Sequence, residues 1–149
     1  MDASGASAAT PGGSDPALAH ALDHVGDRWS LLLVGGLLAG SRRYGELAAA
    51  IPGIAPNVLA DRLRRLTRAG IVRATPYSTR PLRLEYSLTA DGHELAGVVR
   101  LLADWGARQA PGTERMRHAA CGTPLEARWY CATCGRAVDD PADEALQLL

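Results

Sequence analysis

Apolar residues recur along the first third of the chain at the spacing of buried helix faces. Asp15 and Pro16 predict a helix start, because Asp is a favoured N-cap and Pro suits the first helical turn. After a Gly-Asp break, residues 29–39 are apolar nearly all round, which predicts a buried second helix. The first helix carries an apolar face at spacings of four and three residues: Leu18, Leu22 and Val25.

Two further helices are predicted over residues 44–50 and 56–68, joined by a short turn. Pro52 and Gly53 end the first of them, since Pro lacks a backbone donor and Gly favours turn conformations. The second begins with Pro56 in its first turn and ends at a glycine. One side of this helix carries a leucine stripe at helical spacing: Leu59, Leu63 and Leu66.

Two strands and a long helix complete the pattern. Residues 71–76 and 83–88 are typical of strands, and residues 77–81 form the tip between them. Thr89 is the expected cap of a helix that runs to about Gln109. Its apolar face consists of Leu95, Val98, Val99, Leu102 and Trp105. We therefore predict an α+β fold that is mainly α with a small β-hairpin.

The charges are segregated along the chain, although 16 basic and 16 acidic residues cancel overall. Residues 1–27 have four acidic residues and no basic one, giving −4. Residues 28–84 have ten arginines against two acidic residues, giving +8, and residues 85–149 have six arginines against ten acidic residues, giving −4. The middle segment is therefore suited to an anionic partner.

Membrane insertion and export are not expected. The longest apolar stretch, residues 31–39, is shorter than the roughly 20 residues of a membrane span. The N-terminus lacks the basic start and the apolar run of a signal peptide, which predicts a cytoplasmic protein.

Two short helices, a four-residue turn and a two-stranded hairpin occur in the order of a winged helix-turn-helix. The N-terminal end of helix 56–68 is the part that this motif inserts into the major groove. Asn and Arg side chains can make bidentate contacts with bases, and other arginines would contact phosphates. The predicted DNA-contacting residues are Arg42, Arg43, Tyr44, Pro56, Asn57, Asp61, Arg62, Arg64, Arg65 and Arg80. The alternative, a solvated arginine-rich face, is disfavoured by the charge segregation.

Four stretches within residues 16–108 resemble HxlR-type winged helix-turn-helix regulators of bacteria. They are ALDHVGDRWSLL (21–32), RYGEL (43–47), IAPNVLADRL (54–63) and EYSLTADG (85–92). The resemblance implies a dimeric transcriptional regulator, in which the first and last long helices pair across a two-fold axis. The positions carried over to that interface are Leu18, Leu22, Leu95, Val99, Leu102 and Trp105. About half of them could instead be ordinary core residues.

The sequence departs from this family at one position that matters for sensing. Many of these regulators have a cysteine at the start of the first helix, and some use it as a redox or electrophile sensor. Pro16 occupies that position here, and no cysteine precedes Cys121. Sensing by that residue is therefore excluded.

Near the C-terminus, four potential metal ligands form two pairs: His118 with Cys121, and Cys131 with Cys134. Two residues separate the ligands of each pair, and a glycine follows each pair, as in the tight turns that present ligands to tetrahedral Zn²⁺. A module of about 30 residues cannot bury its own core, so metal binding would supply much of its folding energy. We expect a structural Zn²⁺ in a zinc-ribbon-like module, because four ligands leave no open catalytic position. A metal-free thiol cluster is the alternative.

The chain is thus expected to have five parts: a disordered tail (1–14), a winged helix-turn-helix domain for DNA binding and dimerisation (15–110), a linker (111–117), a zinc ribbon (118–138) and an acidic tail (139–149). We predict a repressor that binds a palindromic operator in double-stranded DNA, with a small-molecule effector as a further partner. The alternatives are a protein-interaction adaptor and a regulator whose zinc is ejected by thiol oxidation. No nucleophile–base pair or phosphate loop points to an enzyme.

Overall fold

In the computed structural model, which describes residues 15–138, the chain divides between Ala96 and Gly97 into two units. The predicted winged helix-turn-helix domain spans residues 15–110, whereas residues 97–109 of the last long helix belong to the second unit. The predicted tails, 1–14 and 139–149, lie outside the described residues. Within the described range, no helix is long and apolar enough to cross a bilayer.

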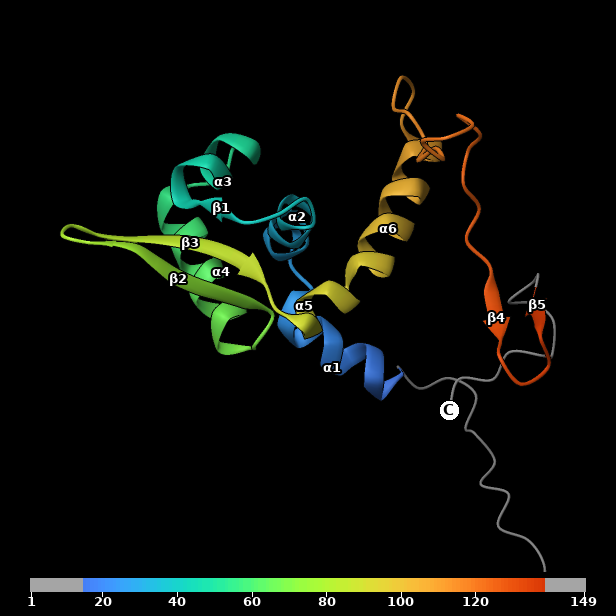
Figure 1. The fold of residues 1–149 in the computed structure, drawn as a ribbon, viewed down its shortest axis with the longest axis horizontal. Helices are drawn as coiled ribbons and strands as arrows, with labels where there is room; N and C mark the ends of the chain where they lie inside the picture. Colours follow the sequence, from blue (N-terminus) through green and yellow to red (C-terminus); the bar gives the residue numbers. More distant parts are fainter. Residues whose placement is uncertain (1–14, 139–149) are drawn as a thin grey trace, which may run out of the picture. The chain divides into compact units, whose positions relative to one another are not determined.

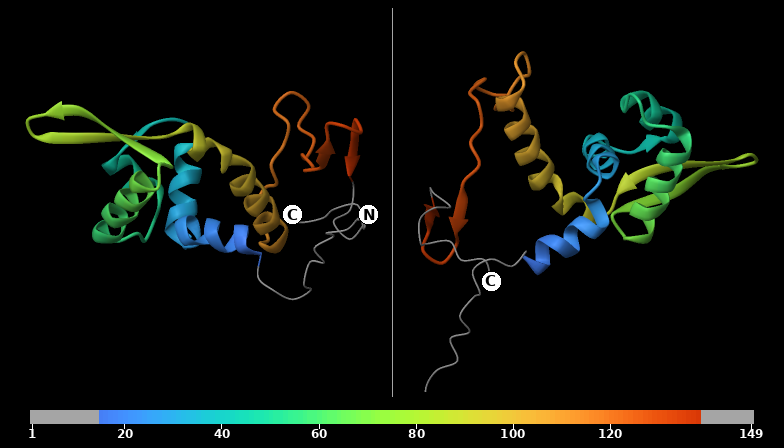
Figure 2. Two further views of the ribbon diagram at one scale, coloured as in Figure 1. Left: turned by 90° about the horizontal axis from the view of Figure 1, so that it is seen from below. Right: turned by 180° about the vertical axis from the view of Figure 1, so that it is seen from behind.

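The described part of the first unit is a winged helix-turn-helix built from five helices and three strands (Figure 1). The helices are α1 (Pro16–Val25), α2 (Arg28–Leu37), α3 (Tyr44–Ala50), α4 (Pro56–Arg68) and α5 (Ala90–Glu94). The strands are β1 (Arg42–Arg43), β2 (Val72–Thr79) and β3 (Leu82–Leu88). They form an antiparallel sheet in the order β1-β3-β2. Both views of Figure 2 show the β2–β3 hairpin extending beyond the helices of this unit.

The core of the first unit gathers the apolar face of each helix around the base of the hairpin. The leucine stripe of α4 is fully buried, as its spacing predicts. The predicted burial of α2 holds for one face, where Leu33, Val34 and Leu37 are buried, whereas Leu32 is 44% exposed. The largest fully buried side chains are Leu33, Leu37, Leu47, Leu59, Leu63, Leu66, Val34 and Val72. This core holds α4 in place by one face and leaves the opposite face free.

The helix starts follow their capping residues closely. Asp15 accepts a hydrogen bond from the Ala17 backbone at the start of α1, as predicted. The hairpin is longer than expected, with strands that reach Thr79 and begin again at Leu82. Pairing across the sheet extends strands beyond the alternating apolar positions that identify them in the sequence.

The long helix predicted from residue 89 to residue 109 is interrupted. Its first turn is α5, which Thr89 caps by accepting a hydrogen bond from Gly92. The backbone N–H of Leu95 donates to the Gly92 carbonyl at 3.3 Å, a tight i→i+3 bond that ends α5. A Cβ at Gly92 would collide with the Ile71 carbonyl, so only glycine permits this packing.

The described part of the second unit contains α6 (Ala96–Gln109) from Gly97 onward, and the two-stranded sheet of β4 (Trp129–Cys131) and β5 (Arg136–Val138). No residue of α6 is buried. Asp104 on α6 forms ion pairs with Arg108 at 2.6 Å and with Arg115 at 2.9 Å. The pair with Arg115 holds the segment that follows α6 against the helix.

Candidate nucleic-acid interface

Helix α4 presents polar and charged side chains on the face opposite its buried leucines. Asn57 is exposed near the N-terminal end, and Arg64 is exposed about two turns from it, with a side chain that is 69% accessible. Asp61 lies between them and is half-buried. A carboxamide and a guanidinium on one exposed helix face are the groups that read base edges in a major groove.

The N-terminal end of α4 is fixed by α3. The Tyr44 hydroxyl donates a hydrogen bond of 2.8 Å to the Pro56 carbonyl, across the helix–turn–helix. Glu46 secures the start of α3 itself, because its carboxylate accepts a 2.6 Å hydrogen bond from the Arg43 backbone N–H. Tyr44 and Pro56 were predicted to contact DNA, and the structure brings them together at the point where the two helices meet.

Arg62 is directed into the protein and away from the exposed face of α4. Its Nε donates to Asp27 Oδ1 at 3.0 Å, and its Nη1 lies 3.0 Å from Asp61 Oδ2. Asp27 also caps α2, where its carboxylate accepts hydrogen bonds from the backbone N–H groups of Trp29 and Ser30. Arg62 was predicted to contact a phosphate, but here its guanidinium joins α4 to α2.

The groups around Asp27 lower the pKa of its carboxyl. Burial raises the pKa, but the Ser30 hydroxyl and backbone N–H, the positive charge of Arg62 and the Trp29 N–H together lower it below its ordinary value of 3.8. The carboxylate is therefore charged at neutral pH and holds both helices. Its role as the N-cap of α2 was not predicted, although an Asp directly before a helix is a usual capping signal.

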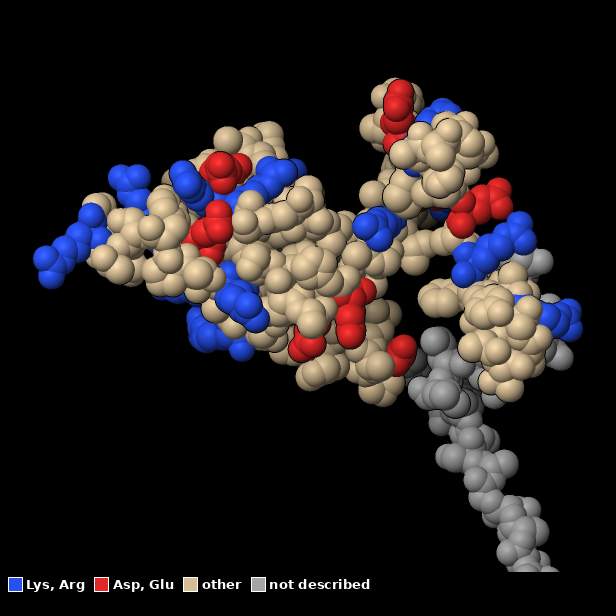
Figure 3. Space-filling view, in the orientation of Figure 1, with Lys and Arg blue, Asp and Glu red and all other residues tan. Residues whose placement is uncertain are grey.

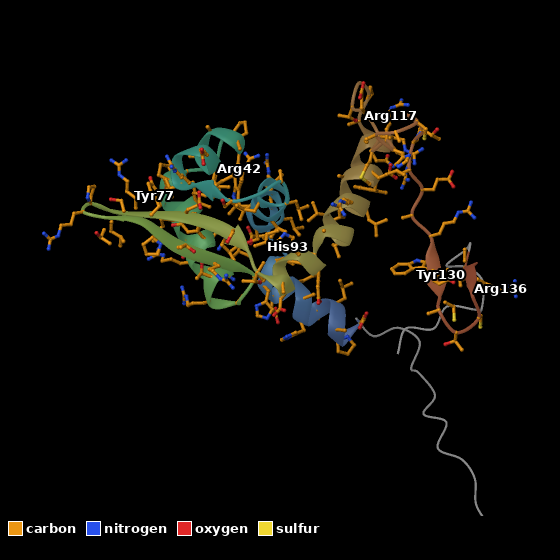
Figure 4. The ribbon with its side chains drawn as sticks, viewed as in Figure 1. Arg42, Tyr77, His93, Arg117, Tyr130 and Arg136 are labelled. Carbon is orange, nitrogen blue, oxygen red and sulfur yellow. The ribbon has the colours of Figure 1, made fainter. Side chains whose placement is uncertain are left out.

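Arginines also line the hairpin beside α3 and α4. Arg42 and Arg43 form β1 and pair with Tyr86 and Glu85 of β3. The Arg43 guanidinium lies over the Tyr77 ring, 4.4 Å from its centre, in a cation–π contact. Figure 4 labels Tyr77 on the hairpin and Arg42 on β1. Arg80 is exposed at the hairpin tip. Figure 3 shows Arg side chains spread along the hairpin and over the helices of this unit.

The second unit carries the four predicted zinc ligands as two separate pairs. His118 Nδ1 lies 3.4 Å from Cys121 Sγ, and a backbone hydrogen bond from Gly122 to His118 closes this turn at 2.8 Å. The Gly135 N–H closes the second turn onto the Cys131 carbonyl at 2.9 Å. Both glycines have positive φ, 69° and 63°, which the tight turns require.

The chemistry of each pair suits a metal, but the described residues do not bring the pairs together. Zn–S and Zn–N bonds of a tetrahedral site place S and N roughly 3.6 Å apart, close to the separation within the first pair. Hydrogen bonding from Thr123, then from His118, lowers the pKa of the Cys121 thiol to about 7. Among residues 15–138, however, no three His, Cys, Asp or Glu side chains are grouped so that they could hold one ion.

The residues predicted to form a dimer interface are exposed to different degrees. Leu18, Leu22, Leu102 and Trp105 are about half exposed, and Trp105 reaches 57%. Leu95 and Val99 are partly covered. The apolar face of α1 and the whole of α6 therefore have exposed hydrophobic surface within the described chain.

The chain matches one protein family over most of its folded part. Residues 24–114 match the HxlR-like helix-turn-helix family. An HTH-type transcriptional regulator of Mycobacterium tuberculosis is 38% identical over 122 residues, which cover 79% of this chain and 77% of that protein. The HTH-type regulator YvaP of Bacillus subtilis is 38% identical over 90 residues, covering 60% of this chain and 83% of that protein.

Solved structures agree with these matches. A Pseudomonas aeruginosa protein described as a candidate transcription factor has a TM-score of 0.63 at 32% identity, with 86% of this chain and 94% of that chain covered. The redox regulator HypR in its reduced form has a TM-score of 0.59 at 31% identity, with 62% of this chain and 92% of that chain covered.

Proposed function

Because the chain belongs to the HxlR-like helix-turn-helix family of transcriptional regulators, which are not enzymes, we propose that it is a dimeric repressor that recognises a palindromic operator. The observation that carries this proposal is the way α4 packs on the first unit. Three buried leucines and Arg62 hold one side of the helix, which leaves Asn57 and Arg64 pointing outward. We place the protein in the cytoplasm, where its operator DNA lies.

In this proposal the N-terminal end of α4 enters the major groove. Asn57 and Arg64 read base edges, with Asp61 between them. Arg42, Arg43 and Arg80 contact phosphates from β1 and the hairpin tip and so fix the register on the duplex. Arg62 contributes by positioning α4, since its guanidinium is paired with Asp27.

Dimerisation would bury the apolar side chains that a monomer leaves exposed. A second copy that covers Leu18 and Leu22 of α1, together with Leu102 and Trp105 of α6, would remove these groups from water. Two-fold symmetry then spaces the half-sites about 34 Å apart, or a multiple of that distance.

Selection of bound fragments from genomic DNA, followed by titration of the selected sequence across salt concentrations, tests the proposal. We expect a specific complex whose affinity falls steeply with salt, because phosphate contacts release counterions. Arg64→Ala should lose sequence preference. Arg100→Ala removes the same charge from α6, which is not part of the helix-turn-helix, and should change little. Failure to bind any DNA while a protein co-purifies would favour the adaptor alternative.

We further propose that His118, Cys121, Cys131 and Cys134 hold a structural Zn²⁺. Support comes from the donor set and from the two glycine-closed turns, and the two pairs would have to converge on one ion. Metal analysis of the full chain should give one zinc per chain, and about none for the Cys131→Ser/Cys134→Ser variant. Thr133→Val, between the two cysteines, is the matched control. A wild-type protein free of zinc after purification without chelators would contradict the proposal.

The thiol-sensing alternative has its own test on the same zinc-loaded protein. Peroxide should release the metal and change operator affinity together if the cysteines act as a sensor. Release of zinc with unchanged operator affinity leaves the metal a structural role only.

A further inference from the structure

A hollow of about 270 Å³ lies within the first unit, between α1 and the C-terminal end of α4. It is lined by Asp23 and His24 from α1 and by Arg65, Arg68 and Ala69 from the end of α4. The hollow is thus walled by two arginines, one carboxylate and one imidazole. No step of the proposed DNA recognition uses this combination of groups.

The two arginines of the hollow are unpaired within the described chain. Arg65 and Arg68 form no ion pair or side-chain hydrogen bond with any residue from 15 to 138, whereas Arg62 on the same helix has two partners. Their i, i+3 spacing places both guanidinium groups on one side of α4. Two neighbouring cations beside one hollow form a fork that suits a single anionic group.

Distance along α4 separates this pair from the end that would meet DNA. Arg68 lies twelve residues beyond Pro56, which is about 18 Å at the rise of an α-helix. The N-terminal residues of a recognition helix contact the base edges, and Arg68 is the last residue of α4, at the opposite end. Arg65, which was predicted to contact DNA, directly follows Arg64 but is turned about 100° from it around α4, and it lines the hollow.

We propose that this hollow binds a small organic monoanion, a carboxylate that also carries a hydroxyl or similar hydrogen-bond donor. Arg65 and Arg68 take the carboxylate, and Asp23 accepts from the donor group. The two arginines and the single carboxylate of Asp23 together carry a charge of +1, which favours a monoanion over a doubly charged phosphate. The volume limits the ligand to a small acid, since pockets for drug-sized molecules start at about 300 Å³.

The position of the hollow suits an effector, and in this respect the inference rests on the proposed function. A ligand here bridges α1, which we assign to the dimer, and α4, which we assign to DNA. At about 100° per residue, Asp23 and His24 lie about 140° and 120° around α1 from Leu18, and about 100° and 160° from Leu22. A dimer that covers Leu18 and Leu22 therefore leaves the hollow open, and the ligand can couple to DNA affinity through α4.

Calorimetric titration of the full-length protein, without DNA, tests the site with 4-hydroxybenzoate as the probe. We expect saturable binding that weakens at least tenfold in Arg65→Gln/Arg68→Gln. Arg73→Gln/Arg83→Gln removes two arginines from the hairpin and should bind the probe like wild type. The neutral isostere 4-hydroxybenzamide should bind at least tenfold more weakly. A circular dichroism melt of each variant confirms that it is folded.

Several results overturn the inference. One is that wild type shows no saturable binding at millimolar probe, and another is that the Arg65/Arg68 variant binds the probe as tightly as wild type. The inference also fails if wild type binds the amide, or inorganic phosphate, as tightly as the probe. Equal loss of affinity for all DNA sequences in the Arg65/Arg68 variant would reassign these arginines to phosphate contacts. A protein that binds the probe but no DNA would keep the site and refute the proposed function. A protein that binds DNA specifically but not the probe would refute the site and keep the proposed function.

Discussion

Arg62 Nε donates a hydrogen bond of 3.0 Å to Asp27 Oδ1, and these residues stand 35 positions apart in the chain. Asp27 uses the same Oδ1 atom to cap the first turn of α2. One carboxylate therefore caps the start of α2 and anchors α4, the helix proposed to read DNA. The pair is partly exposed, with side-chain accessibilities of 21% and 31%, so its contribution combines capping with a screened ion pair.

Removing the Asp27 carboxylate should destabilise the first unit. Asp27→Ala is expected to lower the free energy of unfolding by about 1–3 kcal/mol, because it removes a helix cap and leaves Arg62 with Asp61 alone. Urea denaturation followed by circular dichroism measures this change. Asp23→Ala, a carboxylate of α1 that caps no helix, is the control and should change stability by less than about 0.5 kcal/mol. An Asp27→Ala protein as stable as wild type would show that the cap and the Asp27–Arg62 pair do not stabilise the fold.

The same carboxylate should give a pH-dependent difference in stability. The pKa of Asp27 is lowered in the folded protein, so its stabilisation is present above the unfolded value, near 3.8, and is lost as pH falls through the lower folded value. Asp27→Asn retains a capping group without the charge. The difference in unfolding free energy between wild type and Asp27→Asn should be constant from pH 5 to 7 and shrink below about pH 4. A difference that grows on acidification would contradict the assigned sign.

The Tyr77 ring should hold Arg43 ready for DNA. Tyr77→Leu removes the cation–π contact and is expected to weaken operator binding about two- to fivefold, the equivalent of roughly 0.5–1 kcal/mol. Tyr77→Phe keeps the aromatic face and should bind like wild type. Fluorescence anisotropy with labelled operator measures both. Equal losses in the two variants would point to the Tyr77 hydroxyl.

Local signals in the sequence predicted the helix-turn-helix well. Asp15, Pro16 and Pro56 act on neighbouring backbone groups, so the starts of α1 and α4 could be identified from adjacent residues. The buried leucines of α4 followed from helical periodicity. The break at Leu95 was not predicted, because the apolar stripe continues through this residue although the helical backbone is interrupted there.

Pairings between distant residues could not be predicted from the sequence. The Arg62–Asp27 ion pair and the Arg43–Tyr77 contact join segments 35 and 34 positions apart, and no local pattern marks either partner. Arg62 and Arg64 differ by only two positions, yet one faces α2 and the other faces solvent. Residue type alone therefore overestimated how many arginines of α4 are free to meet DNA.

The exposed apolar face of α1 leads to a prediction about assembly. Leu22→Glu places a charge on a half-exposed position of that face and should shift the protein from dimer to monomer, since a buried unpaired charge costs several kcal/mol at an interface. Leu82→Glu, on the hairpin, alters a leucine that is 66% exposed outside the proposed interface and should leave the dimer intact. Sedimentation equilibrium distinguishes the two states. Leu22→Glu should also bind the operator more weakly, because without the dimer each half-site is bound by a separate monomer. A wild-type monomer at micromolar concentration, or a Leu22→Glu dimer as stable as wild type, would remove α1 from the interface.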